Sequence, residues 1–203
     1  MSSRHAVIVD SGGANLASLR FAIERLGVAA TISSNAEELK RATHVFLPGV
    51  GSAAAAMQRL SSSHLDTALP ALTQPVLGIC LGMQLLFEHS AEGDTRALGI
   101  IPGAVRRMVP SAQRPVPHMG WNRVKTLRDD TLFAGVEAGA YMYFVHSFAA
   151  EISSATTASV EYGGSVSAAV RVRNFHGVQF HPERSAAPGA RLLANFLGLP
   201  SCC

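Results

Sequence analysis

The 203-residue sequence has few charged residues and few cysteines. Charged side chains make up 15% of the chain, the net charge is +3, and no basic run is longer than the pair Arg106 and Arg107. Nucleic-acid-binding domains concentrate positive charge on one face, so we expect no nucleic-acid partner. The three cysteines include an adjacent pair, Cys202 and Cys203, and no C-x-x-C sequence, which argues against a disulfide framework. We therefore expect a reducing, cytoplasmic setting.

Long apolar segments are also missing. The first apolar run breaks at Asp10, so it lacks the extended apolar region of a signal peptide. The longest apolar stretch, PVLGICLGMQLLF at 75–87, is too short to span a bilayer and is interrupted by glycine. We expect no membrane association. The chain is 48% hydrophobic, and its length suits one globular domain over residues 1–203.

Over the first 90 residues, short apolar runs alternate with segments of helical period, which predicts a parallel sheet with crossover helices. The strands are expected at 5–9, 28–33, 44–47 and 75–79. The helices are expected from near residue 15 to 26, over 36–42, over 52–60 and over 81–88. Asn35, with Glu38 three residues later, predicts the cap of the second helix, and Gly27 predicts the end of the first.

Beyond residue 100, short alternating runs are separated by glycine, proline and polar turns, which predicts antiparallel or mixed strands beside the parallel set. These runs lie at 103–108, 121–127, 141–148, 158–164, 165–172 and 175–180. A last helix is expected over 190–197, starting around Pro188. The predicted fold class is α/β, with three layers: a mostly parallel central sheet, flanking helices and an added antiparallel or mixed set of strands.

Cys80 lies where a buried strand should meet a helix, in the sequence G-I-C-L-G from Gly78 to Gly82. Glycine two residues before and two after is the pattern of the G-x-S-x-G elbow, a sharp turn that raises a nucleophile above a sheet. The start of a helix favours a thiolate, and the amide of Leu81 points to where an oxyanion would form. The alternative is a buried cysteine that packs as a small apolar residue, and this stretch alone does not decide between them.

The sequence VQFHPERS offers a base for this thiol. His181 follows a strand-like run, and Glu183 comes two residues later. A strand period of two would direct both side chains to one side, where the carboxylate could hold one ring nitrogen and leave the other for the thiol. The alternative is a solvated histidine with a chance neighbouring glutamate. Four other histidines have no obvious partner and are expected at the surface or at an edge: His5, His44, His64 and His89.

Together these residues predict a Cys-His-Glu triad for acyl transfer, and the motifs GICLGMQLLF and QFHPERS resemble the class I (triad) glutamine amidotransferases, a flavodoxin-like α/β family. The resemblance implies that Cys80 is the nucleophile, that His181 is the general base and acid, and that Glu183 orients it. The implied oxyanion hole consists of Leu81, Gly49, Val50 and Gly51, the last three from LPGVG. The implied contacts to a substrate glutamine come from Gln84, His146, Ser147 and Phe148. Taken alone, LPGVG is more typical of an ordinary glycine turn after a strand.

PHMGWN at 117–122, together with YFVHSF at 143–148, is similar to the glutaminase subunits of imidazole glycerol phosphate synthase, over nearly the whole chain. This similarity implies a heterodimer with a (β/α)8-barrel cyclase subunit, without cofactor or metal. It places Asn15, Trp121 and Arg184 near the partner interface. Ala14 stands where glycine is usual in the family and Arg184 where lysine is common, which puts the interface contacts in question. Core burial is the alternative for Trp121.

The implied activity is hydrolysis of glutamine through a thioester on Cys80. The ammonia would pass to the cyclase subunit, which forms imidazole glycerol phosphate and aminoimidazole carboxamide ribotide in histidine biosynthesis. Two other interpretations remain open: a glutaminase subunit of another amidotransferase, such as pyridoxal phosphate synthase, and a non-enzymatic interaction module or a cysteine hydrolase with another substrate. Complementation of a histidine auxotroph would distinguish the subunit of imidazole glycerol phosphate synthase from that of another amidotransferase. Labelling of Cys80 by a glutamine-analogue chloroketone would distinguish an amidotransferase from an interaction module or another hydrolase. Dinucleotide binding is not favoured, because GGAN lacks the third glycine of G-x-G-x-x-G.

Overall fold

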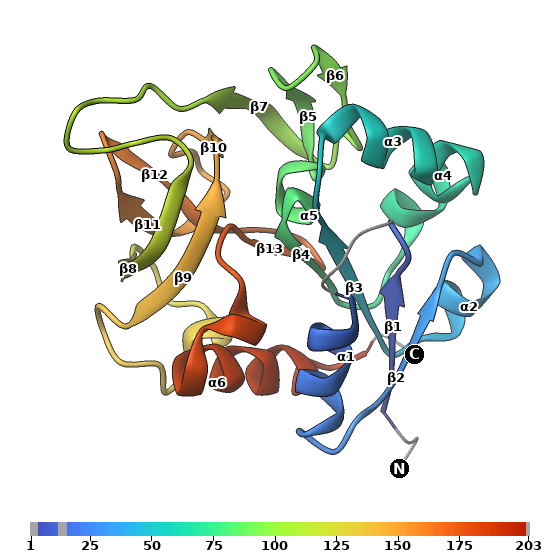
Figure 1. The fold of residues 1–203 in the computed structure, drawn as a ribbon. Helices are drawn as coiled ribbons and strands as arrows, with labels where there is room; N and C mark the ends of the chain where they lie inside the picture. Colours follow the sequence, from blue (N-terminus) through green and yellow to red (C-terminus); the bar gives the residue numbers. More distant parts are fainter. Residues whose placement is uncertain (1–3, 12–15, 202–203) are drawn as a thin grey trace.

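The computed structural model describes residues 4–11 and 16–201, and in these residues a nine-stranded sheet forms the centre of the fold (Figure 1). Five neighbouring strands pair in parallel, in the order β2 (Ala29–Ser33), β1 (His5–Val9), β3 (His44–Gly49), β4 (Val76–Cys80) and β13 (Phe175–Val178). Four antiparallel strands follow, in the order β12 (Ser165–Val172), β11 (Thr156–Glu161), β8 (His118–Thr126) and β9 (Tyr141–His146). The predicted α/β class is confirmed, and the antiparallel strands extend the parallel sheet.

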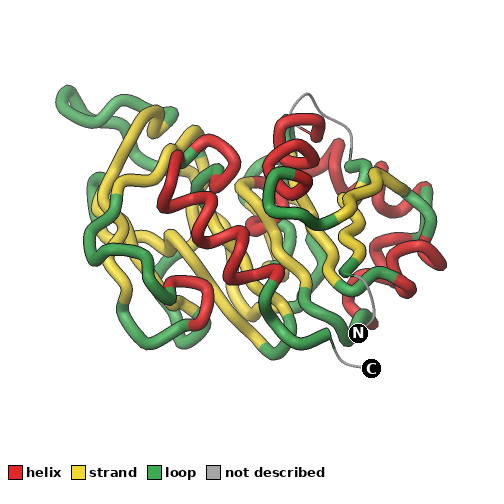
Figure 2. Tube along the Cα trace, turned by 90° about the horizontal axis from the view of Figure 1, so that it is seen from below, coloured by secondary structure: helices red, strands yellow, loops and turns green. Residues whose placement is uncertain are grey.

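Helices cover both faces of this sheet. One face packs against α1 (Leu16–Glu24) and α6 (Ala186–Leu197), and Figure 2 shows α6 lying across the strands. The other face packs against α2 (Ala36–Arg41), α3 (Ala53–Ser62), α4 (Leu65–Ala68) and α5 (Leu81–Gln84). Three short 3-10 turns complete these layers: η1 (Leu69–Ala71), η2 (Thr131–Phe133) and η3 (Pro182–Arg184). None of the helices in the described ranges is long and apolar enough to cross a membrane.

A second, four-stranded sheet within the described residues lies beside α5. Its order is β10 (Phe148–Ala150), β7 (Ile101–Arg107), β5 (Phe87–Ser90) and β6 (Thr95–Arg96). The buried side chains of Phe87, Ile101 and Val105 join the same apolar core as the α2–α5 face of the large sheet. The small sheet therefore adds to the layer that covers the parallel strands near α5.

The residues predicted to cap the second helix and to end the first one do so in the structure. Asn35 caps α2, because its Oδ1 accepts hydrogen bonds from the amides of Glu37 (2.8 Å) and Glu38 (3.3 Å). Gly27 follows α1 with a φ of +78°, the left-handed conformation that ends a helix. Leu19 and Ile23 on α1 are buried, as the spacing of its apolar stripe predicts.

Some predicted boundaries and one predicted location are wrong. The helix expected at 81–88 ends at Gln84, because the chain from Phe87 onward pairs with β7 as strand β5. The strand expected at 44–47 continues to Gly49, which pairs with Cys80 on β4. The last helix begins at Ala186, slightly before the start expected around Pro188. His44 is buried rather than at the surface, and its Nε2 lies 3.1 Å from the Leu199 carbonyl oxygen.

Candidate active site

Cys80 occupies a strained turn between a strand and a helix. It ends β4 and directly precedes α5, and its φ of +54° with ψ of −111° is a conformation that residues with a Cβ rarely adopt. A Cβ on Gly78 would lie 2.6 Å from the Gly82 carbonyl oxygen, and a Cβ on Gly82 would collide with the Leu47 carbonyl. Both glycines therefore permit the close approach of α5, as the elbow pattern predicts.

The Cys80 sulfur is buried among polar groups. Cys80 is 8% exposed, and its thiol donates a hydrogen bond to the Val145 carbonyl oxygen over 3.7 Å. The side-chain amide of Gln179 donates to the sulfur, also over 3.7 Å. The sulfur therefore does not pack only as an apolar group, which was the alternative for this residue.

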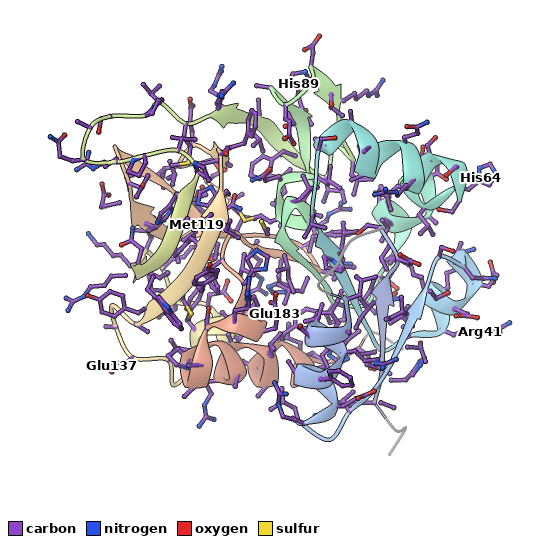
Figure 3. The ribbon with its side chains drawn as sticks, in the orientation of Figure 1. Arg41, His64, His89, Met119, Glu137 and Glu183 are labelled. Atoms are coloured by element: carbon purple, nitrogen blue, oxygen red, sulfur yellow. The ribbon has the colours of Figure 1, made fainter. Side chains whose placement is uncertain are left out.

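His181 is held by its backbone just beyond β13. Its amide donates to the Tyr143 carbonyl oxygen (2.9 Å), and its carbonyl oxygen accepts from the Ser185 hydroxyl (2.7 Å). Its ring Nδ1 lies 2.9 Å from Glu183 Oε1, and the two side chains are only 6% and 2% exposed. Figure 3 shows Glu183 in the middle of the molecule, whereas Arg41, His64 and Glu137 lie at its periphery.

The reason given for this pairing from the sequence is wrong in one respect. The strand period of two does not operate here, because β13 ends at Val178 and residues Pro182–Arg184 form the turn η3. This turn brings the Glu183 carboxylate back to the His181 ring. The histidine and the carboxylate therefore meet as predicted, through a turn rather than through a strand.

The surroundings of His181 favour its charged form. Burial by itself lowers the pKa of His181, but the neighbouring Cys80 sulfur and the Glu183 carboxylate together raise it to about 10. Nε2 of this ring has no partner in strict hydrogen-bonding geometry among the described residues, but the Cys80 sulfur lies close enough to raise the pKa of His181 both as a hydrogen-bond acceptor and by its charge. At neutral pH the proton therefore resides on His181, beside the sulfur.

A cavity of about 640 Å³ opens at Cys80. It brings together segments that are far apart in the sequence, among them the end of β3, the elbow, the turn between β9 and β10, and the residues after β13. The lining includes the residues predicted for catalysis, the oxyanion hole and the substrate, namely Gly49, Val50, Gly51, Cys80, Leu81, Gln84, His146, Ser147, Phe148 and His181. Of the predicted triad, only Glu183 is absent from this lining, because it lies behind His181.

Two parts of the cavity wall suit the binding of an oxyanion: the backbone amide of Leu81 and the glycine loop that contains Gly51. Leu81 is the first residue of α5, so its amide has no acceptor within the helix. Gly51 has a φ of +89°, which glycine adopts without strain. Gly49 is packed tightly, since a Cβ there would lie 2.9 Å from the Leu81 Cβ. The two predicted parts of the oxyanion hole are therefore in contact with one another.

Sequence reasoning missed two polar residues of this site. Glu92 lines the cavity, and its Oε2 accepts a hydrogen bond from the Ala53 amide (2.8 Å) at the start of α3. Gln179 touches the Cys80 sulfur. No local pattern marks Glu92, whereas Gln179 lies inside QFHPERS, two residues before His181.

The residues predicted for the partner interface have different outcomes. Trp121 on β8 is 52% exposed, so core burial, its alternative, is wrong. It lies beside exposed Met119 on the same strand, which is labelled in Figure 3, and near exposed Tyr141 on β9. Arg184 lines the cavity, with its guanidinium 5.1 Å from the centre of the Tyr143 ring. Asn15, also predicted for the interface, lies outside the described residues together with its neighbour Ala14, and so do the terminal cysteines Cys202 and Cys203.

The fold and the site define an α/β protein with a cysteine on a nucleophile elbow and a buried histidine–carboxylate pair beside it. The family model of the class-I glutamine amidotransferases matches residues 7–198. A solved structure described as a glutamine amidotransferase has the same fold, with a TM-score of 0.73 at 16% identity over 96% of this chain and 99% of that chain.

Two curated relatives are much more similar in sequence. Imidazole glycerol phosphate synthase subunit HisH of Xanthomonas campestris pv. campestris is 52% identical over 190 residues, which are 94% of this chain and 95% of that protein. The subunit HisH of Xylella fastidiosa shows the same identity and coverage. The chain therefore belongs to the class-I glutamine amidotransferase family, and within it to the HisH subunits. The resemblance seen in the motifs is confirmed.

Proposed function

We propose that this chain is the glutaminase subunit of an imidazole glycerol phosphate synthase, acting in histidine biosynthesis. One observation carries the proposal: Cys80 and His181 line one cavity and Glu183 contacts His181 from behind, in a chain that is 52% identical to HisH over 94% of its length. We propose that the chain is a single glutaminase domain over residues 1–203 and that it works in the cytoplasm, where a thiol nucleophile stays reduced.

The first half of the reaction forms a thioester. The Cys80 thiolate attacks the side-chain carboxamide carbon of glutamine, and the carbonyl oxygen becomes an oxyanion. The Leu81 amide and the segment Gly49–Gly51 donate hydrogen bonds to this oxyanion; losing one such donor costs about a hundredfold or more in rate. His181, which carries the proton, transfers it to the departing nitrogen, so that ammonia leaves and the acyl group remains on sulfur.

The second half releases glutamate. His181 is now neutral, and its Nε2 accepts a proton from water as the water attacks the thioester carbon. The carbon–sulfur bond then breaks, the thiolate of Cys80 is restored, and His181 is again protonated. Glu183 holds Nδ1 through both halves, which keeps the ring orientation and stabilises the imidazolium.

The polar groups in the lining of the cavity suit a free amino acid. Gln84 and the backbone of His146, Ser147 and Phe148 surround the space beside the sulfur. Glu92 contributes a carboxylate to the same lining, and we assign it to the α-ammonium group of the substrate glutamine. A zwitterionic ligand with a carboxamide side chain therefore matches both the charge and the reactive group of the site.

The partner in this proposal is a cyclase subunit with a (β/α)8 barrel, joined in a heterodimer that works as a lyase complex. Ammonia released into water would be protonated and lost to the synthesis, so a direct passage to the cyclase is required. The exposed side chains of Met119, Trp121 and Tyr141 form an apolar surface on β8 and β9, which supports docking there. Arg184 and Asn15 are proposed to contribute to the same interface.

The test is the variant Cys80→Ala, with Cys202→Ala as its matched control. We expect Cys80→Ala to lose glutamine hydrolysis, because no nucleophile remains, while ammonia-dependent synthesis by the complex with the cyclase subunit continues. Cys202→Ala should retain both activities. Release of glutamate at the native rate by Cys80→Ala would show that the nucleophile is another residue. Failure of the unmodified chain to support glutamine-dependent synthesis with a cyclase subunit would contradict the choice of partner.

A further inference from the structure

Gln179 places a fully buried amide between the sulfur of Cys80 and the side chain of Gln84. It directly follows β13 and is 0% exposed. Its Nε2 lies 3.7 Å from the Cys80 sulfur, and its Oε1 lies 3.0 Å from Gln84 Nε2. Burial of an amide is costly unless both of its ends are hydrogen-bonded, and here both ends have partners.

The direction of this amide follows from its neighbours. The Phe148 carbonyl oxygen can only accept a hydrogen bond, so the Gln84 atom 2.9 Å from it must be the NH2 group. The same NH2 group faces Gln179, so the Gln179 atom opposite it must be oxygen. The NH2 group of Gln179 is therefore left facing the sulfur. The Phe148 carbonyl oxygen thus sets the orientation of the Gln84 amide, and Gln84 sets that of Gln179. The result is a hydrogen-bond donor directed at Cys80.

This donor distinguishes between the two protonation states of Cys80. The thiol can donate its proton to the Val145 carbonyl oxygen, 3.7 Å away, but the thiolate cannot, and the carbonyl dipole then opposes the negative charge. The N–H of Gln179 remains favourable in both states and is stronger toward the charged one. The contact therefore favours the thiolate over the thiol.

We propose that Gln179 is a further catalytic residue of this enzyme, one that stabilises the Cys80 thiolate through its side-chain N–H and ties the position of the sulfur to Gln84 in the substrate site. This inference rests on the proposed function, in which Cys80 is the nucleophile. A residue that only filled the core would contribute to stability without affecting the reactivity of the thiol.

The first experiment measures the rate of Cys80 alkylation by iodoacetamide as a function of pH, in a chain that carries Cys202→Ser and Cys203→Ser. In Gln179→Met the pH profile should move to higher pH by about one unit, so that the alkylation rate falls about tenfold at pH values well below the midpoint and the high-pH plateau is unchanged. An unchanged profile in a folded Gln179→Met variant would overturn the proposal.

Gln74 provides the matched control for this variant. It is also a buried glutamine, and its Nε2 donates to the Leu39 carbonyl oxygen over 2.7 Å, away from the cavity. Gln74→Met removes an equivalent amide, so it should lower the melting temperature without moving the alkylation profile. A shift of the profile in Gln74→Met as large as that in Gln179→Met would show that loss of packing is the cause, and would overturn the proposal.

The second experiment needs no substitution at Gln179, so it remains decisive if Gln179→Met does not fold. The side-chain NH2 resonances of Gln179 in the 15N-labelled protein should titrate with the same midpoint as Cys80 alkylation. They should stop titrating in Cys80→Ala, and the NH2 resonances of Gln74 should not move in either protein. Gln179 resonances that stay constant across the midpoint would contradict the hydrogen bond to the thiolate.

The glutaminase assay separates failure of this inference from failure of the proposed function. If Cys80→Ala is inactive and Gln179→Met has the alkylation profile of the unmodified chain, the proposed function stands and the role of Gln179 is refuted. If Cys80→Ala keeps the native rate of glutamate release, the nucleophile is wrong, and the role of Gln179 is refuted together with it.

Discussion

The backbone of Cys80 is held in a conformation that disfavours any residue with a Cβ. A positive φ costs about 1–3 kcal/mol at such a residue, and the surrounding contacts must offset it. Here α5 packs against Leu47 of β3 through Gly82, and Cys80 pairs with Gly49 at the end of the same strand. The strain is compatible with function, because this turn places the sulfur at the cavity wall and the Leu81 amide beside it.

The charge of Glu183 is expected to set the alkaline limit of the glutaminase reaction. Glu183→Gln can still accept from His181 Nδ1, but it removes the charge that helps to raise the pKa of His181 to about 10. The proton donor to ammonia is then lost at lower pH, so the alkaline limb of kcat should move to lower pH. The value of kcat should fall about a hundredfold or more.

Measurement of kcat from pH 6 to pH 10.5 checks this expectation, and Glu137→Gln is its control. Glu137 is an exposed carboxylate at the periphery of the molecule (Figure 3), so its substitution should leave the profile unchanged. An alkaline limb in Glu183→Gln that coincides with that of the unmodified chain would contradict the role given to the carboxylate.

At the scale of an element, α5 is a helix of only four residues that depends on close backbone contact. Gly82→Ala would drive a Cβ into the Leu47 carbonyl, and backbone on both sides leaves no room for relaxation. We expect a loss of about 3 kcal/mol or more in the free energy of unfolding, or failure to fold. Urea denaturation followed by circular dichroism measures this loss.

Gly99→Ala separates steric collision from the general cost of losing a glycine. Gly99 has a φ of +66° and open space around the position of a Cβ, so its substitution should cost about 1–2 kcal/mol from backbone strain alone. If Gly82→Ala costs no more than Gly99→Ala, the close approach of α5 to β3 is not what requires a glycine in the elbow.

The segment after α5 shows how an element can be misread from its own residues. Residues 81–88 have an apolar pattern that fits a helix, yet Phe87–Ser90 forms strand β5. Phe87 pairs with Ile101 and is buried against the α2–α5 side of the sheet. The pairing partner lies outside the segment, so the local pattern could not distinguish the two structures.

At the scale of the whole molecule, several buried histidines are held neutral by the fold. Burial lowers the pKa values of His118, His146 and His176 to about 4. Nδ1 of His118 also lies 3.0 Å from Nε2 of His146, and His146 Nδ1 lies 2.8 Å from the Phe148 carbonyl oxygen at the cavity. Protonation of either ring would therefore disturb the pair and the substrate site together.

These histidines predict that acid destabilises the protein. Between pH 6.5 and pH 4 the unfolded chain binds protons at these positions and the native protein does not, so the free energy of unfolding should fall as the pH falls. One independent histidine of this kind accounts for about 3 kcal/mol at pH 4; His118 and His146 are in contact, so their effects are not additive.

Urea denaturation at pH 7, 6, 5 and 4 measures this dependence. His176→Leu should make it less steep, because one buried proton-binding site is removed, whereas substitution of the exposed His64 by leucine should leave the slope unchanged. A free energy of unfolding that is constant between pH 6.5 and pH 4 would contradict the burial of these rings as neutral groups.

The sequence by itself determined those features that depend on neighbouring residues. The cap at Asn35, the alternation of strands and helices, and the elbow with Gly78 and Gly82 are local, because each depends on residues a few positions apart. The order of residues in HPE likewise predicted that His181 and Glu183 would meet. These signals were sufficient for the fold class and the family, and they single out Cys80 as the candidate nucleophile.

Only the tertiary structure decided which distant residues share the cavity. Gln84 and Gln179 are 95 residues apart and meet because β4 and β13 are neighbours in the sheet, an order that hydrophobic periodicity does not encode. Glu92 reaches the cavity from a turn of the small sheet, and Trp121 is exposed because β8 and β9 lie at the end of the large one. Such placements follow from long-range packing, since each depends on how many segments fill one core together.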